Sequence, residues 1–215
     1  MSAITLFDLN KSLFERITSE DNLREAFRVV RRNKGAPGID GITVDDFDAH
    51  LDKELGQLRK ELVGWTYEPR PVRRVEIPKP GTTDVRILGV PCIRDRVVQV
   101  SIKGVLEPIF EAKFSEHSYG FRPGRSQRQA VEAAQKIVSS GKEFVVDIDL
   151  SKFFDRVQHD RLVHRLSLEI SDKRVLRLIG MTLRSGVMVN GLRMSTEEGT
   201  TQGSPLSPLL SNVVL

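Results

Sequence analysis

Two acidic side chains interrupt an apolar run near the middle of this chain. Asp147 and Asp149 alternate with Val146, Ile148 and Leu150, so on a strand both carboxylates project from one face. That spacing puts them roughly 6–7 Å apart, too far to share one small ion unless the chain bends. Carboxylate oxygens are ligands that Mg²⁺ prefers. Asp149, nearer the end of the strand, is therefore the stronger candidate for a metal ligand.

Three kinds of site fit this Asp-x-Asp pattern. One is a polymerase site, where two ions roughly 4 Å apart activate a primer hydroxyl and hold a triphosphate. Another is a phosphatase of the haloacid dehalogenase type, whose nucleophile strand also ends in Asp-x-Asp. The third is a pair of carboxylates that bind nearby arginines and have no catalytic role. Only 66 residues follow Asp149, too few for the remaining strands of a doubly wound sheet, which weakens the phosphatase hypothesis.

Composition narrows the protein class. The chain has 215 residues, one cysteine and a formal net charge of +4. A single cysteine excludes an internal disulfide, and no apolar run is long enough for a transmembrane helix, so we expect a cytoplasmic protein with no membrane contact. Between Arg70 and Lys103 eight basic residues face three acidic ones. This excess suits a phosphate chain, although a solvated surface without a ligand would have the same composition.

The surrounding elements are predicted from periodicity and from turn residues. We expect helices over 21–32, 43–62 (with a Thr43–Asp46 capping box), 94–106 (ending before Pro108), 126–138 and 171–183 (capped by Ser171). A hairpin should join 70–77 to 85–88, and a second hairpin should turn at Asn190-Gly191. Residues 144–150 should form a buried strand, residues 115–125 an irregular loop, and Pro205 should lie in the first turn of a last helix. The mixture is α+β.

Some chemically capable side chains are better explained as structural. They are Trp65 and Phe153 as core residues, Cys92 as a helix-start residue, and Asp155 as a local ion-pair or helix-capping residue. His117, His159 and His164 lack metal-ligand spacing with Cys92 and are interpreted as structural or RNA-adjacent.

Five segments in one order carry a family resemblance. They are Asn33–Gly41, Val75–Gly81 with Arg86, Ser118–Arg125, Val145–Asp155 and Glu198–Pro208. Together they resemble the N-terminal part of a bacterial group II intron-encoded reverse transcriptase and maturase, of the compact type found with the group IIC class. The resemblance covers residues 14–215. It implies an α+β fold, the fingers and partial palm of a right-hand polymerase (reverse transcriptase fold), truncated before the paired-Asp hairpin.

The resemblance also divides the chain into domains. Residues 1–90 and 158–195 correspond to fingers, with an N-terminal extension loop at 33–41, and residues 91–157 and 196–215 correspond to a partial palm. No Tyr-x-Asp-Asp hairpin, thumb or maturase DNA-binding segment follows in this sequence. We therefore expect a fragment that is inactive alone, that exposes apolar surface, and that associates as a homo-oligomer.

Roles at the reaction centre follow from the same resemblance. Asp149 would be the catalytic, metal-binding carboxylate, with the Leu150 carbonyl as a further ligand and Mg²⁺, or alternatively Mn²⁺, as the cofactor. Phe154 would act as a steric gate against a 2′-hydroxyl. The incoming deoxynucleoside triphosphate would be contacted by Lys79, Arg86, Phe154 and Gln202.

The other candidate residues would contact nucleic acid. They are Asn33, Lys34, Gly35, Arg73, Arg74, Tyr119, Arg122, Arg125 and Gly203. Arg73 and Arg74 are equally well explained as solvated strand residues. The implied function is RNA-directed DNA synthesis with maturase-type RNA binding, and the implied partners are template RNA, a DNA primer and group II intron RNA in a bacterial cytoplasm. One alternative is a non-catalytic RNA-binding module, in which RNA binding by the basic face is the sole function. The other is a reverse transcriptase of a defence-associated lineage.

Overall fold

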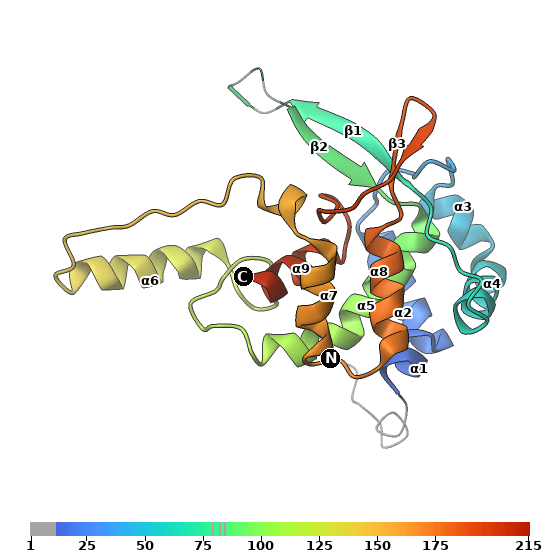
Figure 1. Ribbon diagram of the computed structural model, residues 1–215, viewed down its shortest axis with the longest axis horizontal. Coiled ribbons are helices and arrows are strands. Elements are labelled where there is room, and N and C mark those ends of the chain that lie inside the picture. The colour runs from blue at the N-terminus through green and yellow to red at the C-terminus, as the bar shows by residue number, and fades with distance from the viewer. Residues whose placement is uncertain (1–11, 79, 82, 84) are drawn as a thin grey trace.

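The computed structural model describes residues 12–78, 80, 81, 83 and 85–215. Lys79, predicted to bind the triphosphate, lies outside the described residues. The helices are α1 (Leu13–Ile17), α2 (Glu20–Arg32), α3 (Val44–Ala49), α4 (Leu51–Val63), α5 (Ile93–Glu111), α6 (Gln127–Ser139), η1 (Phe153–Arg156, 3₁₀), α7 (His159–Ser167), α8 (Lys173–Leu183) and α9 (Ser207–Val214). The strands are β1 (Val72–Pro78), β2 (Val85–Val90), β3 (Val187–Val189) and β4 (Leu192–Met194). Figure 1 shows a helical body with the sheet projecting from one end and α6 projecting sideways.

The core is built around α5, which packs against α1, α2 and α9. Val97, Val98 and Ile102 of this helix are fully buried. The prediction that the helix ends before Pro108 is wrong, because α5 continues to Glu111. Pro108 removes one hydrogen bond to the carbonyl of Gly104, but both residues are exposed, so water can satisfy that carbonyl.

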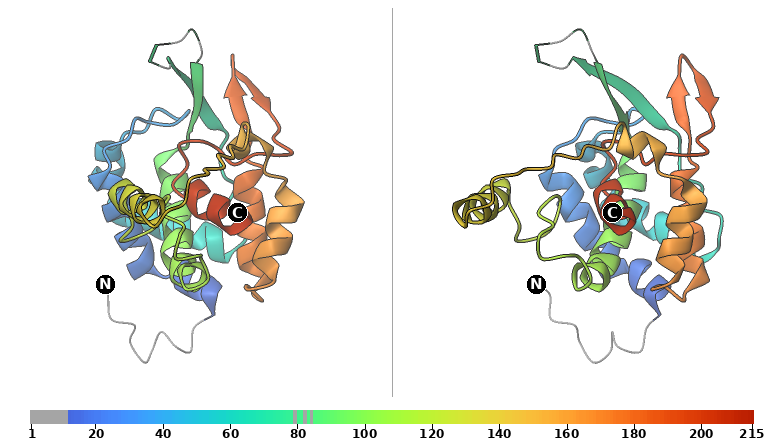
Figure 2. Two further views of the ribbon diagram at one scale, coloured as in Figure 1. Left: turned by 90° about the vertical axis from the view of Figure 1, so that its left-hand side faces the viewer. Right: turned by 60° about the vertical axis from the view of Figure 1, so that its left-hand side comes forward.

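The sheet has the strand order β2-β1-β3-β4. The antiparallel β1–β2 pair places Arg74 opposite Gly89, and the parallel β1–β3 pair places Val72 opposite Val187. Both predicted hairpins are confirmed, and the β3–β4 turn uses Asn190 and Gly191 at positive φ as a two-residue turn requires. The β1–β2 hairpin extends beyond the helical body in all three ribbon views (Figures 1 and 2).

The predicted buried strand over 144–150 is wrong for this structure. The segment carries no strand assignment, and Phe144, Val146 and Ile148 are 92%, 83% and 80% exposed. A strand requires a hydrogen-bonding partner, and no described segment pairs with this one. The preceding α6 has the predicted position and a Ser126–Gln129 capping box, yet none of its residues is buried. Part of the apolar surface expected to be exposed lies on this arm, which projects from the body (Figure 2).

Three predicted helix details differ in the structure. The Thr43–Asp46 capping box is confirmed, but the helix that it starts breaks at His50 into α3 and α4. Asp172, not Ser171, caps α8 through a bond from the Arg174 amide of 3.1 Å. Pro208, not Pro205, occupies the first turn of α9. Among the described residues, no helix has the length and apolar character needed to cross a bilayer.

A buried polar cluster joins the end of α4 to the start of α5. The Tyr67 hydroxyl donates to Asp95 Oδ1 at 2.7 Å, and the Arg70 amide donates to Asp95 Oδ2 at 3.1 Å. Asp95 is 1% exposed. Burial removes its carboxylate from water and raises the pKa of Asp95 to about 6, although hydrogen bonds and nearby arginines oppose the shift.

This pKa predicts a pH dependence of stability. Since the folded-state pKa lies above the unfolded value of 3.8, the stabilising contribution is complete below about pH 4 and is lost as pH rises through 6. At about 1.4 kcal/mol per pKa unit, the loss is roughly 3 kcal/mol. Urea unfolding from pH 4 to pH 7 should show the stability difference between the native protein and Asp95→Asn changing by that amount. A difference independent of pH would contradict the prediction.

Candidate active site

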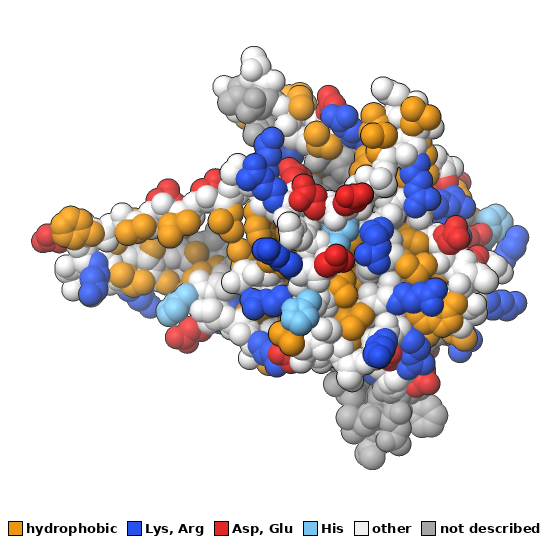
Figure 3. Space-filling model, in the orientation of Figure 1, with side chains coloured by type: hydrophobic (Ala, Val, Ile, Leu, Met, Phe, Trp, Pro, Cys, Tyr) orange, Lys and Arg blue, Asp and Glu red, His pale blue; other side chains and the backbone are white. Residues whose placement is uncertain are grey.

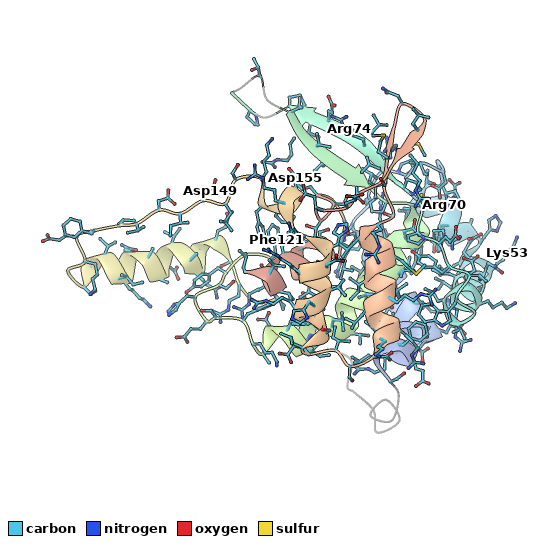
Figure 4. The ribbon with its side chains drawn as sticks, viewed as in Figure 1. Lys53, Arg70, Arg74, Phe121, Asp149 and Asp155 are labelled. Carbon is cyan, nitrogen blue, oxygen red and sulfur yellow. The ribbon has the colours of Figure 1, made fainter. Side chains whose placement is uncertain are left out.

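A cleft of about 730 Å³ lies between the sheet and two loops. It brings together Arg86 from β2, Asp149 from the extended segment and Gln202 from the loop before α9. These three were predicted to act at one nucleotide site, and they come from widely separated parts of the chain. Lys152 and Glu198 also line the cleft and were not identified from the sequence. The side chains around Asp149 and Asp155 are drawn in Figure 4.

Backbone hydrogen bonds fix the two loops to one another. The Thr200 amide donates to the Phe154 carbonyl at 2.7 Å, and the Gly199 amide donates to the Val157 carbonyl at 2.7 Å. The ring of His159 is buried, and its Nε2 lies 2.8 Å from the Gly199 carbonyl oxygen. The structural interpretation of His159 is thereby confirmed, and the floor of the cleft is held by main-chain contacts.

Two glycines hold the base of the β1–β2 hairpin against the same loop. The Gly89 amide donates to the Gln202 carbonyl at 2.8 Å. Gly203 has a φ of +102°, and a Cβ there would lie 2.8 Å from the Gly89 carbonyl oxygen, while a Cβ on Gly89 would lie 2.1 Å from the Thr201 methyl. Sequence reasoning missed Gly89, although a glycine inside a strand pattern is a known sign of close backbone approach. We call this contact the Gly89–Gly203 latch.

Carboxylates gather on one side of the cleft. Asp149, Asp155 and Glu198 all contribute to its lining, and acidic side chains lie beside the hollow below the sheet in Figure 3. The prediction that Asp155 pairs locally or caps α7 is wrong for the described part of the chain, because Gln158 occupies the cap and no ion pair involves Asp155. No group of three His, Cys, Asp or Glu side chains among the described residues is arranged to hold a metal.

A carboxylate at one edge is nonetheless compatible with Mg²⁺. This ion often takes only one or two protein carboxylates and completes its shell with water and substrate phosphates. Asp149 is exposed and faces the same cleft as Arg86 and Lys152. The donor set therefore fits an ion that arrives with a triphosphate, and it does not form a closed cage.

Phe154 lies beside the cleft and does not line it. Its ring meets Phe121 edge-on at 6.3 Å and Phe153 at 6.0 Å. Phe153 packs against the core, as predicted, and Phe121 is 65% exposed. The neighbours Lys152 and Asp155 do line the cleft, so Phe154 is within one residue of the proposed nucleotide site.

The described basic residues between 70 and 103 leave less free charge for phosphate than their number suggested. Arg94 pairs with Glu61, Arg74 pairs with Glu76 at 2.7 Å, and Lys103 pairs with Glu107 at 3.4 Å. Arg96 is 8% exposed and burial lowers its pKa. Much of this charge is compensated or buried, which charge counting cannot detect.

Three arginines of this segment hold the 33–41 loop. Arg96 donates to the Ala36 carbonyl, Arg73 Nε donates to the Pro37 carbonyl at 3.1 Å, and Arg70 pairs with Asp40 at 2.8 Å. A Cβ on Gly35 would lie 2.4 Å from Arg96 Nη1. Two carbonyls and the Asp40 carboxylate therefore fix the loop to these arginines. Asn33 and Lys34 remain exposed, as a nucleic-acid contact requires. Gly35 serves close packing.

The 115–125 loop has a comparable internal anchor. Arg122 is 8% exposed and donates to Glu111 at 2.8 Å and to the Ser118 carbonyl at 2.8 Å. This placement contradicts the prediction that Arg122 contacts nucleic acid, because its guanidinium is enclosed by the loop. Arg125 stacks over Tyr119 at 5.6 Å, and both are partly exposed.

Comparison with known proteins identifies relatives along nearly the whole chain. Residues 77–215 match the family described as reverse transcriptase (RNA-dependent DNA polymerase). Protein YkfC of Escherichia coli is 40% identical over 94% of this chain and 55% of its own length. The group II intron-encoded protein LtrA of Lactococcus lactis is 33% identical over 94% of this chain and 34% of its own length.

Solved structures show the same fold. A partial Cas6-RT-Cas1–Cas2 complex contains a chain that superposes with a TM-score of 0.65 and 24% identity, covering 95% of this chain and 34% of that one. The present chain thus spans about half the length of YkfC and a third of the length of LtrA.

The Gly89–Gly203 latch predicts unequal effects of two glycine substitutions. Gly203→Ala should lower the free energy of unfolding by about 1–3 kcal/mol, because it combines positive φ with a clash at the Gly89 carbonyl. Gly56→Ala is the matched control, since Gly56 lies in α4 with open space around an added Cβ, and it should stabilise by about 0.5–1 kcal/mol. Urea unfolding followed by circular dichroism measures both. Equal stability of Gly203→Ala and the native protein would exclude the latch.

Proposed function

We propose that this chain, which belongs to the reverse transcriptase (RNA-dependent DNA polymerase) family, provides the nucleotide site of a group II intron RNA-directed DNA polymerase. Its relatives are group II intron-encoded proteins and intron maturases. One observation carries the proposal: Arg86, Asp149 and Gln202 line a single cleft. Arg86 and Lys152 could bind the phosphates of a nucleoside triphosphate, and Asp149 could bind the Mg²⁺ that accompanies it.

Residues of the cleft divide the work of binding the nucleotide. Arg86 and Lys152 would bind phosphate oxygens, and arginine suits this role because its planar fork gives two parallel hydrogen bonds. Gln202 would lie beside the base pair, positioned by its own carbonyl in the Gly89–Gly203 latch. The main-chain bonds from Gly199 and Thr200 hold these groups in place before substrate arrives, which lowers the ordering cost of binding.

The family generally uses a divalent metal. In this chain Asp149 would hold Mg²⁺, or alternatively Mn²⁺, and the Leu150 carbonyl would be the second ligand. The ion supplies charge neutralisation at the triphosphate and activation of the primer hydroxyl. Asp149 is the single side-chain carboxylate proposed here as a metal ligand, and one carboxylate lacks the charge to hold both ions that synthesis needs. We therefore propose that the 215-residue chain alone does not extend a primer.

Nucleic acid would contact residues around the cleft. The exposed Asn33 and Lys34 would meet template RNA from the pinned 33–41 loop. The other proposed contacts are Arg73 and Arg74 on β1, Tyr119 and Arg125 in the 115–125 loop, and Gly203 in the latch. The proposed partners are template RNA, a DNA primer and group II intron RNA, with residues 1–90 and 158–195 as fingers and 91–157 and 196–215 as palm.

A non-catalytic RNA-binding module is the second candidate function. It is favoured by the exposure of Asn33 and Lys34 on the anchored 33–41 loop. The two candidates differ in what Asp149 does, because only a polymerase needs its carboxylate for synthesis.

Substitution of Asp149 separates these functions. In a form of the protein extended to the length of its relatives, Asp149→Asn should reduce Mg²⁺-dependent primer extension on an RNA template by at least about 100-fold, since it removes a metal ligand. RNA binding measured by filter retention should be unchanged. Retained DNA synthesis in this variant would overturn the assignment of Asp149.

Substitution of Phe154 tests the steric gate in the same extended form. Phe154→Val should raise incorporation of ribonucleotides relative to deoxynucleotides by about 10- to 100-fold, because the ring no longer occupies the space of a 2′-hydroxyl. Phe153→Leu is the control, since Phe153 packs against the core and its change should leave the ratio unaltered. An unchanged ratio in Phe154→Val would remove Phe154 from the gate.

A further inference from the structure

We propose that the outer face of the α7–α8 hairpin is a second nucleic-acid-binding surface, outside the cleft, that takes a phosphodiester backbone. We call it the α7–α8 basic face and define it by Arg161, Arg165, Lys173, Arg177 and Arg184, all exposed. In Figure 3, Lys and Arg side chains gather over α7 and α8, which face the viewer. None of the five lines the cleft.

Helix geometry places these cations on the solvent side of both helices. On α7, Leu162 and Leu166 are buried, so Arg161 and Arg165, one turn apart, point away from the core. On α8, the buried positions include Val175, Leu178 and Ile179. The spacing of Lys173, Arg177 and Arg184 gives a stripe opposite that buried side. The cations of the two helices therefore lie on one surface.

Little negative charge on the hairpin offsets this surface. Within the described part of the chain, Glu169 pairs with Lys113, and Asp172 pairs with Arg174 at 2.9 Å. Asp160 is the remaining carboxylate of the hairpin. None of the five cations forms an ion pair with a described residue, whereas much of the charge in the 70–103 segment is paired or buried. The α7–α8 basic face therefore offers a polyanion more uncompensated charge than that segment does.

A groove between the helices adds hydrogen-bonding groups. It has a volume of about 500 Å³ and is lined by Asp160, His164, Ser167, Arg177 and Arg184, together with apolar side chains and Gly180. A Cβ on Gly180 would lie 2.8 Å from Arg184 Nη2, so glycine lets this guanidinium lie across the helix.

The position of Arg177 is fixed by aromatic contacts. Its guanidinium carbon lies 4.7 Å from the centre of the Trp65 ring, and Trp65 stacks on Phe14 at 5.2 Å. Trp65 is partly buried and packs against the core, in agreement with its predicted role as an anchor. A guanidinium held in this way loses less conformational freedom when it binds a phosphate.

The chemistry of the face favours a nucleic acid over a membrane. Membrane-surface helices pair a basic side with a broad apolar side that enters the lipid. On the hairpin, which the structure describes in full, Leu168 is the one exposed large apolar residue. The inference goes beyond the proposed function, because none of these five cations lines the cleft. It rests on the proposed function only in taking the partner to be a nucleic acid.

Salt-dependent binding tests the α7–α8 basic face. The probes are a structured RNA hairpin and a DNA duplex of the same sequence, titrated with the 215-residue chain between 50 and 200 mM KCl. The triple variant Arg161→Gln, Arg165→Gln, Arg184→Gln should bind at least about tenfold more weakly at low salt. The slope of log affinity against log salt should fall by about 2–3, since each lost phosphate contact removes about 0.7–0.9. A larger change for RNA than for DNA identifies RNA as the source of the backbone.

A matched triple variant controls for loss of charge. Arg24→Gln, Arg28→Gln and Arg128→Gln remove three cations that already have carboxylate partners, and they should leave the salt slope unchanged. Equal slopes for the face variant and the native chain, with both folded by circular dichroism, would overturn the inference. Binding to anionic phosphatidylglycerol vesicles but to neither nucleic acid would also overturn it.

The experiment distinguishes this inference from the proposed function. Arg86→Gln in the cleft should weaken binding of a deoxynucleoside triphosphate and leave the salt slope for RNA close to the native value. The face variant should give the opposite result. If Arg86→Gln leaves nucleotide binding unchanged while the face variant still loses RNA affinity, the proposed function fails and the α7–α8 basic face stands.

Discussion

The arrangement of the cleft depends on a main-chain contact between two glycines. The Gly89 amide donates to the Gln202 carbonyl, and Gly203 approaches the Gly89 carbonyl so closely that neither position has room for a side chain. This contact joins a hairpin from the first half of the chain to a loop near residue 200. Through Gly199 and Thr200 that loop is in turn bonded to the segment that follows Asp149. These backbone contacts bring Arg86, Asp149 and Gln202 to one cleft.

Arginine has two separate functions in this fold. Arg70, Arg73 and Arg96 hold the 33–41 loop, while Arg122 holds the 115–125 loop. Buried guanidinium groups donate several hydrogen bonds to carbonyls that would otherwise lack partners. The arginines of the α7–α8 basic face (Arg161, Arg165, Arg177 and Arg184) remain exposed and without described ion pairs. The same residue type therefore shapes loops in one region and presents charge in another, and only the structure separates these uses.

Local signals predicted much of the fold, and partner-dependent features were missed. The Thr43–Asp46 capping box and the Asn190-Gly191 turn were predictable because neighbouring residues determine them. The 144–150 strand was not, because a strand requires a partner. The continuation of α5 through Pro108 was also missed, because it depends on water reaching the Gly104 carbonyl. At the site, the family motifs located Arg86, Asp149 and Gln202, whereas the burial of Arg122 and the role of Gly89 depend on residues distant in sequence.

The central claim is that the cleft lined by Arg86, Asp149 and Gln202 binds a metal–nucleotide complex. Substitution of Fe²⁺ for Mg²⁺ in the presence of a deoxynucleoside triphosphate, followed by ascorbate and peroxide, cleaves the backbone near the bound ion. The account predicts cuts close to residues 149–155 and 198–202, mapped by mass spectrometry and suppressed by excess Mg²⁺. Nucleotide-dependent cuts confined to any other region, or no such cuts, would contradict it.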